Sequence, residues 1–245
     1  MSVPEPFYAD GEHLAIDLPG ARALFTTRRG GYSGGPYESL NLGRFTDDEP
    51  AAVERNREAL ERHLGVRFAY GRQVHGVRVQ RVTVAPPGGG VPADADGQAT
   101  SLRGLAPMVL TADCLPIAVA GGGAVAMLHA GWRGLAAGVV AEGVSAVREL
   151  GDDVLLTAAI GPGAGGCCYE VSDDVHEAFA QYGTRVRRGR TLDLAAVARI
   201  QLERAGVATI HDIGLCTICS DPGLFFSHRR DHGVTGRQAG IAWLT

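Results

Sequence analysis

Two side chains that can bind a metal or act in catalysis lie in one segment of this chain, TADCLPIAVAGGGAVAMLHAGWRG at 111–134. Cys114 and His129 each belong to an apolar run, and three glycines separate the runs, a pattern that predicts a β-hairpin. A two-residue turn at Gly121 and Gly122 would place Cys114 directly opposite His129. Side chains opposed on one face are about 5 Å apart at Cβ, close enough to share a metal ion or a proton. The alternative is a buried cysteine and a structural histidine in a core hairpin.

A third candidate ligand is His75, in the sequence QVHG. A cysteine and two histidines form a recognised catalytic zinc set, which leaves one position of the tetrahedron for water or substrate. Water bound at such a site reaches a pKa near ~7 and can supply hydroxide at neutral pH. Asp113 would point to the opposite face of the strand from Cys114, so we expect it to support the site rather than bind the ion. A single histidine near a strand end is also compatible with a structural role.

The basic residues of the chain are all arginines, 23 in number, and none is lysine. Lysine Schiff-base chemistry and a Walker lysine are therefore excluded, and an anionic substrate must be bound by guanidinium groups, backbone amides or a metal. Arg133 lies beside a helix start that could hold an anion. The strongest anion-binding candidate near the C-terminus is SHRRD at 227–231 with TGR at 235–237. A solvated turn with salt bridges is the alternative there, and the same ambiguity applies to Arg55 and Arg57.

The remaining cysteines are less informative. The CTIC sequence at 216–219 has ligand spacing, but a structural zinc site needs a second pair of ligands. Cys167 and Cys168 are direct neighbours, which is a poor geometry for that purpose, so we do not expect a second zinc. An odd number of cysteines, five in 245 residues, fits a reducing compartment better than a disulfide framework.

Composition excludes several classes of protein. A hydrophobic content of 45% with 20% charged residues is typical of globular proteins, and a net charge of −4 gives no general attraction to nucleic acid or anionic lipid. No apolar run reaches the ~18 residues of a membrane span, and the N-terminus does not resemble a signal peptide. We therefore expect a cytoplasmic protein that binds neither nucleic acid nor membranes, with no obligate protein partner.

Strand and helix patterns alternate along the whole chain. Strands are expected within 14–27, 67–84, 105–111, 154–160, 208–215, 224–230 and 238–245, besides the hairpin. Helices are expected over 47–65, 135–150, 172–183 and 193–206, with Thr46 or Asp47 capping the first and Ser172 and Asp193 capping the last two. Residues 86–92 are expected to form a turn and 93–100 a polar loop. We predict one mixed α/β or α+β domain spanning 1–245.

Over roughly residues 20 to 243 the chain resembles the YfiH/YlmD family. These proteins were long described as multicopper-oxidase-like or laccase-domain proteins, and are now described as purine nucleoside phosphorylases. The matching segments are GGYSGGPYESLNLG, the Asn56-Arg57 pair, QVHG, ADGQAT, TADCLP, HAGWRG, IGP with CCYEV, CT at 216–217, and FFSHRRD with TGR. The resemblance implies a YfiH-like, single-domain layered fold in which mixed β-sheets are flanked by helices.

The resemblance also implies an activity and a site. His75, Cys114 and His129 would bind zinc and act in catalysis, with copper less expected than zinc. The substrates would be phosphate and the purine nucleosides adenosine, inosine, guanosine and methylthioadenosine, with deamination of adenosine as a second activity. Arg57 matches the phosphate-binding arginine of the family. Further contacts to substrate or phosphate are expected from Asn41, Arg133, His228 and Arg229.

Three other functions compete with this interpretation. Copper-dependent polyphenol oxidation needs many histidine ligands, whereas this chain has eight scattered histidines without the HxH pairs of multicopper sites. A hydrolase that edits peptidoglycan precursors would use Cys114 as the nucleophile and a histidine as the base. A pure binding protein would form the metal site without turning over any nucleoside.

Overall fold

The computed structural model describes residues 3–84, 93–152 and 154–245. Its strands are β1 (Tyr8–Asp10), β2 (His13–Leu18), β3 (Ala21–Phe25), β4 (Arg67–Ala69), β5 (Val79–Arg81), β6 (Gly97–Thr100), β7 (Leu105–Thr111), β8 (Leu115–Gly121), β9 (Ala124–Ala130), β10 (Leu156–Ile160), β11 (Arg187–Arg188), β12 (Thr191–Leu192), β13 (Val207–Asp212) and β14 (Gln238–Leu244). Its helices are α1 (Pro50–Leu64), α2 (Trp132–Ala137), α3 (Val139–Leu150), α4 (Asp173–Ala178) and α5 (Leu194–Arg204), with short 3-10 helices η1 (Gly35–Tyr37) and η2 (Ala180–Arg185).

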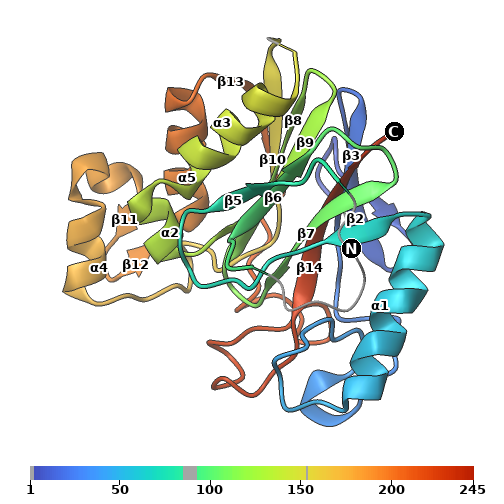
Figure 1. The fold of residues 1–245 in the computed structure, drawn as a ribbon. Helices are drawn as coiled ribbons and strands as arrows, with labels where there is room; N and C mark the ends of the chain where they lie inside the picture. Colours follow the sequence, from blue (N-terminus) through green and yellow to red (C-terminus); the bar gives the residue numbers. More distant parts are fainter. Residues whose placement is uncertain (1–2, 85–92, 153) are drawn as a thin grey trace.

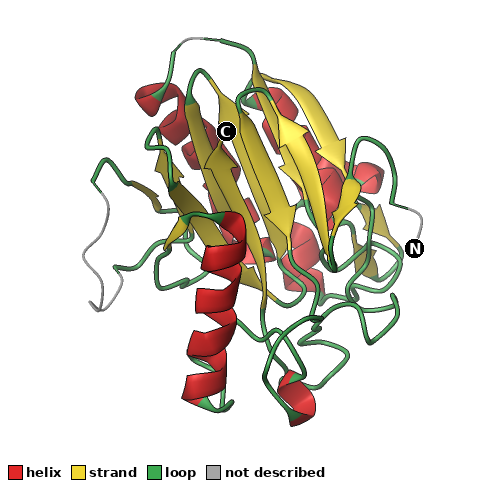
Figure 2. Cartoon of the chain, turned by 90° about the vertical axis from the view of Figure 1, so that its right-hand side faces the viewer, coloured by secondary structure: helices red, strands yellow, loops and turns green. Residues whose placement is uncertain are grey.

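Two six-stranded sheets form the centre of the molecule (Figure 1). The strand order is β1-β2-β3-β14-β7-β4 in the first sheet and β13-β10-β8-β9-β6-β5 in the second. Both sheets are mixed, because β4 runs parallel to β7, β5 parallel to β6, and β10 parallel to β13, while the other neighbours are antiparallel. The predicted mixed fold with helices flanking its sheets is confirmed, and Figure 2 shows α1 in front of the strands and the other α-helices behind them.

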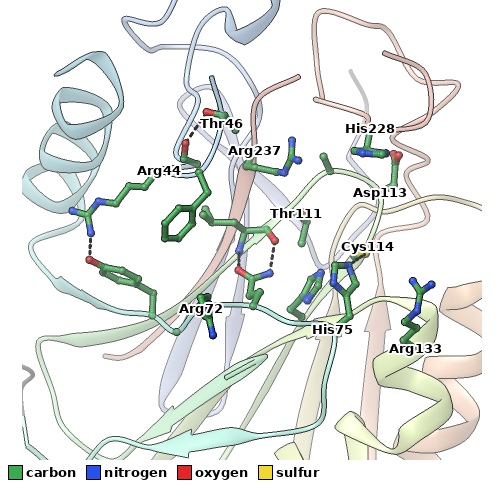
Figure 3. A pocket seen from close by; sticks show the side chains of 18 of the residues that line it. Arg44, Thr46, Arg72, His75, Thr111, Asp113, Cys114, Arg133, His228 and Arg237 are labelled. Atoms are coloured by element: carbon green, nitrogen blue, oxygen red, sulfur yellow. Dashed lines mark hydrogen bonds between the residues drawn. The ribbon is translucent and has the colours of Figure 1, made fainter. Parts of the chain in front are cut away.

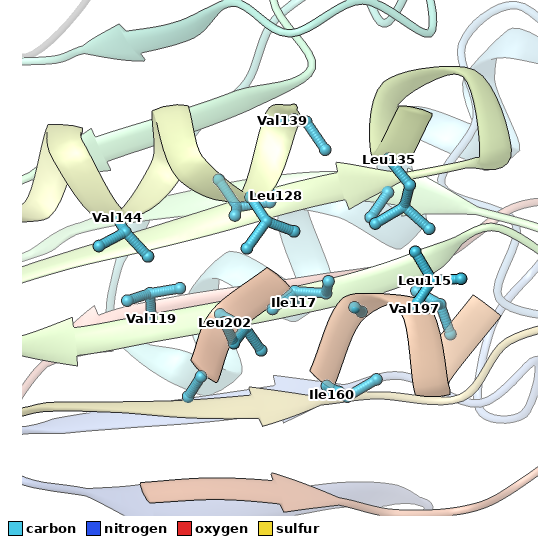
Figure 4. Close-up of a cluster of buried hydrophobic side chains, with 14 of the residues drawn as sticks. Leu115, Ile117, Val119, Leu128, Leu135, Val139, Val144, Ile160, Val197 and Leu202 are labelled. Atoms are coloured by element: carbon cyan, nitrogen blue, oxygen red, sulfur yellow. The ribbon is translucent and has the colours of Figure 1, made fainter. Parts of the chain in front are cut away.

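Strand β8 shows how the layers are held together. Its side chains alternate between two faces, as a period of two requires. On one face, Leu115, Ile117 and Val119 pack with residues of α3 and α5. On the other face, Ala118 and Ala120 pack against side chains of β2 and β3 in the first sheet. Figure 4 shows the helix-covered side, where branched aliphatic side chains fill the space between helices and strands. Burying each such side chain contributes about 1.5–3 kcal/mol, so this layer fixes the hairpin that carries the site.

Most of the predicted elements are present, with local corrections. The first helix ends at Gly65 in a left-handed conformation as expected, but it begins at Pro50 after Glu49 rather than at Thr46 or Asp47. The helix predicted over 135–150 is divided into α2 and α3, because Gly138 adopts a φ of 101° and ends the first of them. The helix predicted over 172–183 ends after six residues at Ala178 and continues as η2.

Two further predictions are wrong, and one lies outside the described residues. The segment 93–100 is not a polar loop throughout, since β6 is a fully buried strand between β9 and β5. Residues 224–230 form a loop, not a strand. The turn expected at 86–92 falls among residues that the structure does not describe. No helix in the described ranges combines the length and the apolar character needed to cross a membrane.

The hairpin forms with a register that differs from the prediction. Gly122 and Gly123, not Gly121 and Gly122, make the turn, and Gly121 pairs with Ala124. His129 is therefore opposite Pro116. Compared with the prediction, each residue of one strand pairs with a residue two positions further along the other strand. A shift of two leaves each side chain on its predicted face of the sheet.

We predict that Gly122→Ala destabilises the protein more than Gly123→Ala. Both glycines have a positive φ, 60° and 77°, so alanine costs about 1–2 kcal/mol of backbone strain at either position. Only at Gly122 would the new Cβ lie 2.3 Å from a backbone atom, the carbonyl oxygen of Asp152, whereas Gly123 faces open space. Urea unfolding of both variants checks this. Equal losses of stability would contradict the tight packing of the turn against Asp152.

Candidate functional site

His75, Cys114 and His129 converge where β8 begins and β9 ends, in the middle of the second sheet. Figure 3 shows the side chains of His75 and Cys114 next to each other. One ligand atom from each lies within 4.8 Å of the others, and the Cys114 Sγ is 4.0 Å from the Nε2 of His75. The two imidazole rings meet edge to face with their centroids 4.9 Å apart. The structure therefore brings together the three residues that the sequence singled out.

The hairpin provides two of these side chains, and a close approach of its backbone makes room for the third. Cys114 directly precedes β8, and His129 lies near the end of β9. Gly131 follows that strand with an ordinary φ of −78°. A Cβ at Gly131 would lie 2.8 Å from the Cys114 Sγ and 3.2 Å from the Cδ2 of His75. The absence of a side chain at Gly131 thus allows the thiol and the His75 ring to approach each other.

Asp96 organises the two histidines. Its carboxylate accepts a hydrogen bond from the Nδ1 of His129 at 2.8 Å, and from the backbone amides of Val74, His75 and Gly76 at 3.1, 2.9 and 2.7 Å. The Nε2 of His129 is therefore the nitrogen left free for a ligand. Although burial raises the pKa of Asp96, the hydrogen bonds from His129 and from the amides of Gly76 and Val74 lower it below its usual value, which keeps the carboxylate ionised. Sequence reasoning missed this role, and its only signal was the ADGQAT segment.

The thiol and the buried imidazole stabilise each other's charged forms. Burial raises the pKa of Cys114, but the charge of His129 and hydrogen bonds from both imidazoles outweigh it and bring the pKa to about 6. Burial lowers the pKa of His129, but the Cys114 thiolate and Asp96 raise it to about 9. The thiolate is the form of cysteine that binds metals. A thiolate and two imidazoles fit an ion that takes mixed sulfur and nitrogen ligands, such as zinc or copper.

A cavity of about 490 Å³ opens over these three residues. Asp113 is the one acidic residue among the described residues that line it. Six arginines line it as well: Arg44, Arg57, Arg72, Arg133, Arg229 and Arg237. Arg44 pairs with Glu54 and Arg72 with Asp94. The other four arginines form no salt bridge with any carboxylate in the described part of the chain. The cavity therefore presents unneutralised positive charge to an anion.

Arg57 is the most deeply buried of these arginines, with 4% of its surface exposed. It extends from α1, donates a hydrogen bond from Nη1 to the Leu42 carbonyl at 2.9 Å, and lies over the Tyr70 ring. Burial lowers its pKa to about 10, so it stays charged at neutral pH. Arg55, for which the sequence left anion binding open as it did for Arg57, stacks on Tyr32 and does not line the cavity.

The other candidate substrate residues divide into two groups. Arg133, His228 and Arg229 line the cavity, as does Arg237 of the TGR segment. Asn41 does not line it. The Asn41 side chain is fully buried, and its Oδ1 accepts hydrogen bonds from the amides of Gly43 and Arg237 at 3.0 and 2.8 Å. Asn41 thus positions two backbone segments of the cavity wall from behind.

Asp113 connects the end of the hairpin to the C-terminal loop. It has a φ of 96°, and its carboxylate accepts hydrogen bonds from the Thr217 hydroxyl at 2.6 Å and from the Arg229 amide at 2.7 Å. Both oxygens are therefore engaged, in agreement with a supporting role rather than ligation. Through this contact the residue before Cys114 holds the loop that carries His228 and Arg229 against the cavity.

We predict that Gly131→Ala weakens metal binding at least about 10-fold while the protein stays folded. The backbone conformation of Gly131 suits alanine, so the effect would come from the new methyl group separating Cys114 from His75. Competition titrations with a chelator measure the affinity, and Gly34→Ala is the matched control because a Cβ there meets nothing within 4 Å. Unchanged affinity in Gly131→Ala would show that ligand spacing does not depend on this glycine.

Comparisons with known proteins place the chain among relatives of similar length. A family model described as multi-copper polyphenol oxidoreductase laccase matches residues 22–245. A purine nucleoside phosphorylase from Xylella fastidiosa is 44% identical over 92% of this chain and 93% of its own length, and one from Pseudomonas aeruginosa is 42% identical over 91% and 93%. The crystal structure of YlmD from Geobacillus stearothermophilus superposes with a TM-score of 0.89 at 34% identity, covering 98% of this chain and 99% of that one. With its sequence matched almost from end to end and its fold shared, the chain belongs to the laccase-like YfiH/YlmD family.

Proposed function

We propose that this protein is a zinc-dependent purine nucleoside phosphorylase that also deaminates adenosine. The observation that carries the proposal is that the His75, Cys114 and His129 cluster shares one cavity with arginines that have no carboxylate partner. Such a cavity can bind an inorganic anion beside a group that polarises a neutral organic substrate. The names of the relatives support a phosphate-dependent reaction of a nucleoside.

In phosphorolysis, a phosphate oxygen forms a bond to C1′ of the ribose while the bond from C1′ to N9 of the purine breaks. The base leaves with the electron pair and takes up the proton that the attacking hydrogen phosphate loses, so the products are the free base and ribose 1-phosphate. Arg57 and Arg237 are suited to hold the phosphate, since burial lowers the pKa of both and a bound dianion would offset that cost. Guanidinium groups grip phosphate through two parallel hydrogen bonds and so also fix its orientation.

Flat side chains in the same cavity are suited to hold the purine. Phe45, Trp132 and Tyr169 all line it, and Phe45 is 81% exposed, which is unusual for a large apolar residue. A purine ring stacked on such a surface would be removed from water on one face. We propose that this stacking positions the nucleoside between the phosphate and the metal-binding residues.

The donor set determines what a bound metal would contribute. Zinc held by His75, Cys114 and His129 would supply Lewis acidity and a water molecule activated near neutral pH, which deamination of adenosine requires. The protein's own part is to orient the ligands: Asp96 fixes the His129 ring, and the amides bonded to Asp96 hold the His75 segment in place. The Asp113 contacts keep the cavity wall closed beside Cys114.

Two alternatives are weighed by specific observations. The thiolate of Cys114 beside His129 has the arrangement of a cysteine nucleophile and its base, which favours the editing hydrolase as the second candidate. Polyphenol oxidation by several coppers is less well supported. Among the residues described, the clusters of three or more metal-capable side chains contain only two histidines, His75 and His129.

We predict that Cys114→Ala abolishes both phosphorolysis and deamination. Loss of the only sulfur ligand of the cluster removes both the thiolate and the metal on which the shared site depends. The purified protein is incubated with adenosine and phosphate, and adenine, ribose 1-phosphate and inosine are measured. Full phosphorolysis by the variant would contradict a shared site, and no turnover by the unaltered protein would favour the hydrolase or a binding protein.

We predict that Arg57→Met separates the two activities. Hydrogen bonds to charged groups contribute about 1.5–3 kcal/mol, so kcat/KM for phosphate should fall about 10- to 100-fold. Deamination consumes no phosphate, and its rate should stay within about 3-fold of the unaltered enzyme. Arg55→Met is the matched control, since that arginine extends from the same helix outside the cavity. Equal losses of both activities would argue against Arg57 as the phosphate ligand.

A further inference from the structure

The structure gathers four cysteines at a second position. One sulfur from each of Cys167, Cys168, Cys216 and Cys219 lies within 4.8 Å of the others. The expectation that the neighbouring pair Cys167 and Cys168 has an unsuitable geometry is therefore wrong. The four residues are separate from the cavity, since none of them lines it.

The sheet explains why these distant segments meet. Strands β10 and β13 are parallel neighbours, so their C-terminal ends, and the turns that follow them, lie at the same end of the sheet. The pairing extends beyond the strands, because Gly163 forms a parallel bridge with Cys216 and accepts a hydrogen bond from the Thr217 amide at 2.9 Å. Each turn thus presents a cysteine pair to the other.

The spacing of the sulfurs suits a single tetrahedral ion. With zinc–sulfur bonds of about 2.3 Å, the sulfurs of a four-thiolate site lie ~3.8 Å from one another. The Sγ atoms of Cys167 and Cys219 are 3.6 Å apart, and the largest separation in the cluster stays within 4.8 Å. A disulfide would need about 2.05 Å, and all four cysteines are free thiols. An iron–sulfur cluster would hold its ligands further apart than one ion does.

The backbone around the cluster is already arranged for thiolates. The Gly165 amide donates a hydrogen bond to the Cys216 Sγ at 3.3 Å. A Cβ at Gly165 would lie 3.1 Å from the Cys167 Sγ and 3.3 Å from the Cys216 Sγ, so a side chain there would crowd both sulfurs. Cys216 is buried whereas Cys167 and Cys219 are exposed, which gives an ion a route to the site.

We propose that Cys167, Cys168, Cys216 and Cys219 form a second metal site that holds a structural zinc ion. All four ligands come from the protein, which is the pattern of structural rather than catalytic zinc sites. Binding would release the thiol protons to solvent, since the thiolate is the ligand form. The ion would cross-link the turn after β10 to the turn after β13.

This cross-link would support the wall of the cavity. Thr217, within the CTIC sequence, donates a hydrogen bond from its hydroxyl group to the Asp113 carboxylate. Its carbonyl oxygen accepts a hydrogen bond from Arg230. On the other turn, the Ala164 amide bonds to the Asp113 carbonyl at 2.7 Å, and Tyr169 lines the cavity directly after Cys168. Both turns therefore contact Asp113, the residue that precedes Cys114.

The metal content of the whole 245-residue chain tests the proposal. Proteins expressed with ample zinc are dialysed and measured by mass spectrometry of the metal. We expect about two zinc ions per chain in the unaltered protein, with Cys219→Ser losing one of them and Cys114→Ser losing the other. Cys219→Ser should also lower the thermal midpoint. The proposal is overturned if Cys219→Ser retains as much zinc as the unaltered protein.

A spectroscopic measurement keeps the test decisive if Cys219→Ser does not fold. In Cys114→Ser, cobalt(II) substituted for zinc can gain thiolate ligands only from the four-cysteine cluster. We expect intense sulfur-to-cobalt charge-transfer bands together with the visible bands of tetrahedral coordination. Absence of these bands, or titration showing Cys167 and Cys219 oxidised to a disulfide in the metal-exposed protein, would refute a zinc site and indicate a redox pair instead.

Discussion

The buried carboxylate of Asp96 is the contact on which the geometry of the site depends. Asp96 lies immediately before β6, and it binds His129 twice, through the imidazole Nδ1 and through its own carbonyl, which accepts the His129 amide at 2.7 Å. The same carboxylate accepts the amides of residues 74–76, which have no regular secondary structure. One charged group thus ties His129 on a rigid strand to His75 on a loop. Without the Asp96 carboxylate, His75 would lie on a segment that no hydrogen bonds of a sheet or helix hold in place.

The sequence predicted the hairpin, and the approach of Cys114 and His129 to each other, more reliably than the surroundings of these residues. Apolar runs around glycines indicate a hairpin, but three glycines allow two positions for the turn. In the turn that forms, Gly122 packs against the backbone of Asp152, a tertiary contact that the sequence does not show. The predicted and the observed register differ by two positions, an even number. Cys114 and His129 therefore lie on the same face of the hairpin in both.

The parts that could not be predicted involve contacts between remote segments. Asp96 precedes a strand whose four residues are all buried, and the polar letters around it resemble a surface loop. The four-cysteine cluster requires knowing that β10 and β13 are parallel neighbours, which spacing within either segment does not reveal. Arg57 and Arg55 are two residues apart, and only the orientation of α1 shows which one lines the cavity.

The exclusive use of arginine in the cavity has a consequence for its behaviour in a cell. Guanidinium groups keep their protons far above neutrality, and even Arg57, with its pKa lowered to about 10, remains a cation at any cellular pH. They also escape the acetylation that neutralises lysine. The positive charge that these arginines give the cavity therefore does not change with cellular pH or with lysine-type acetylation. Any response of the site to acidity must therefore arise elsewhere, in its thiol and imidazole groups.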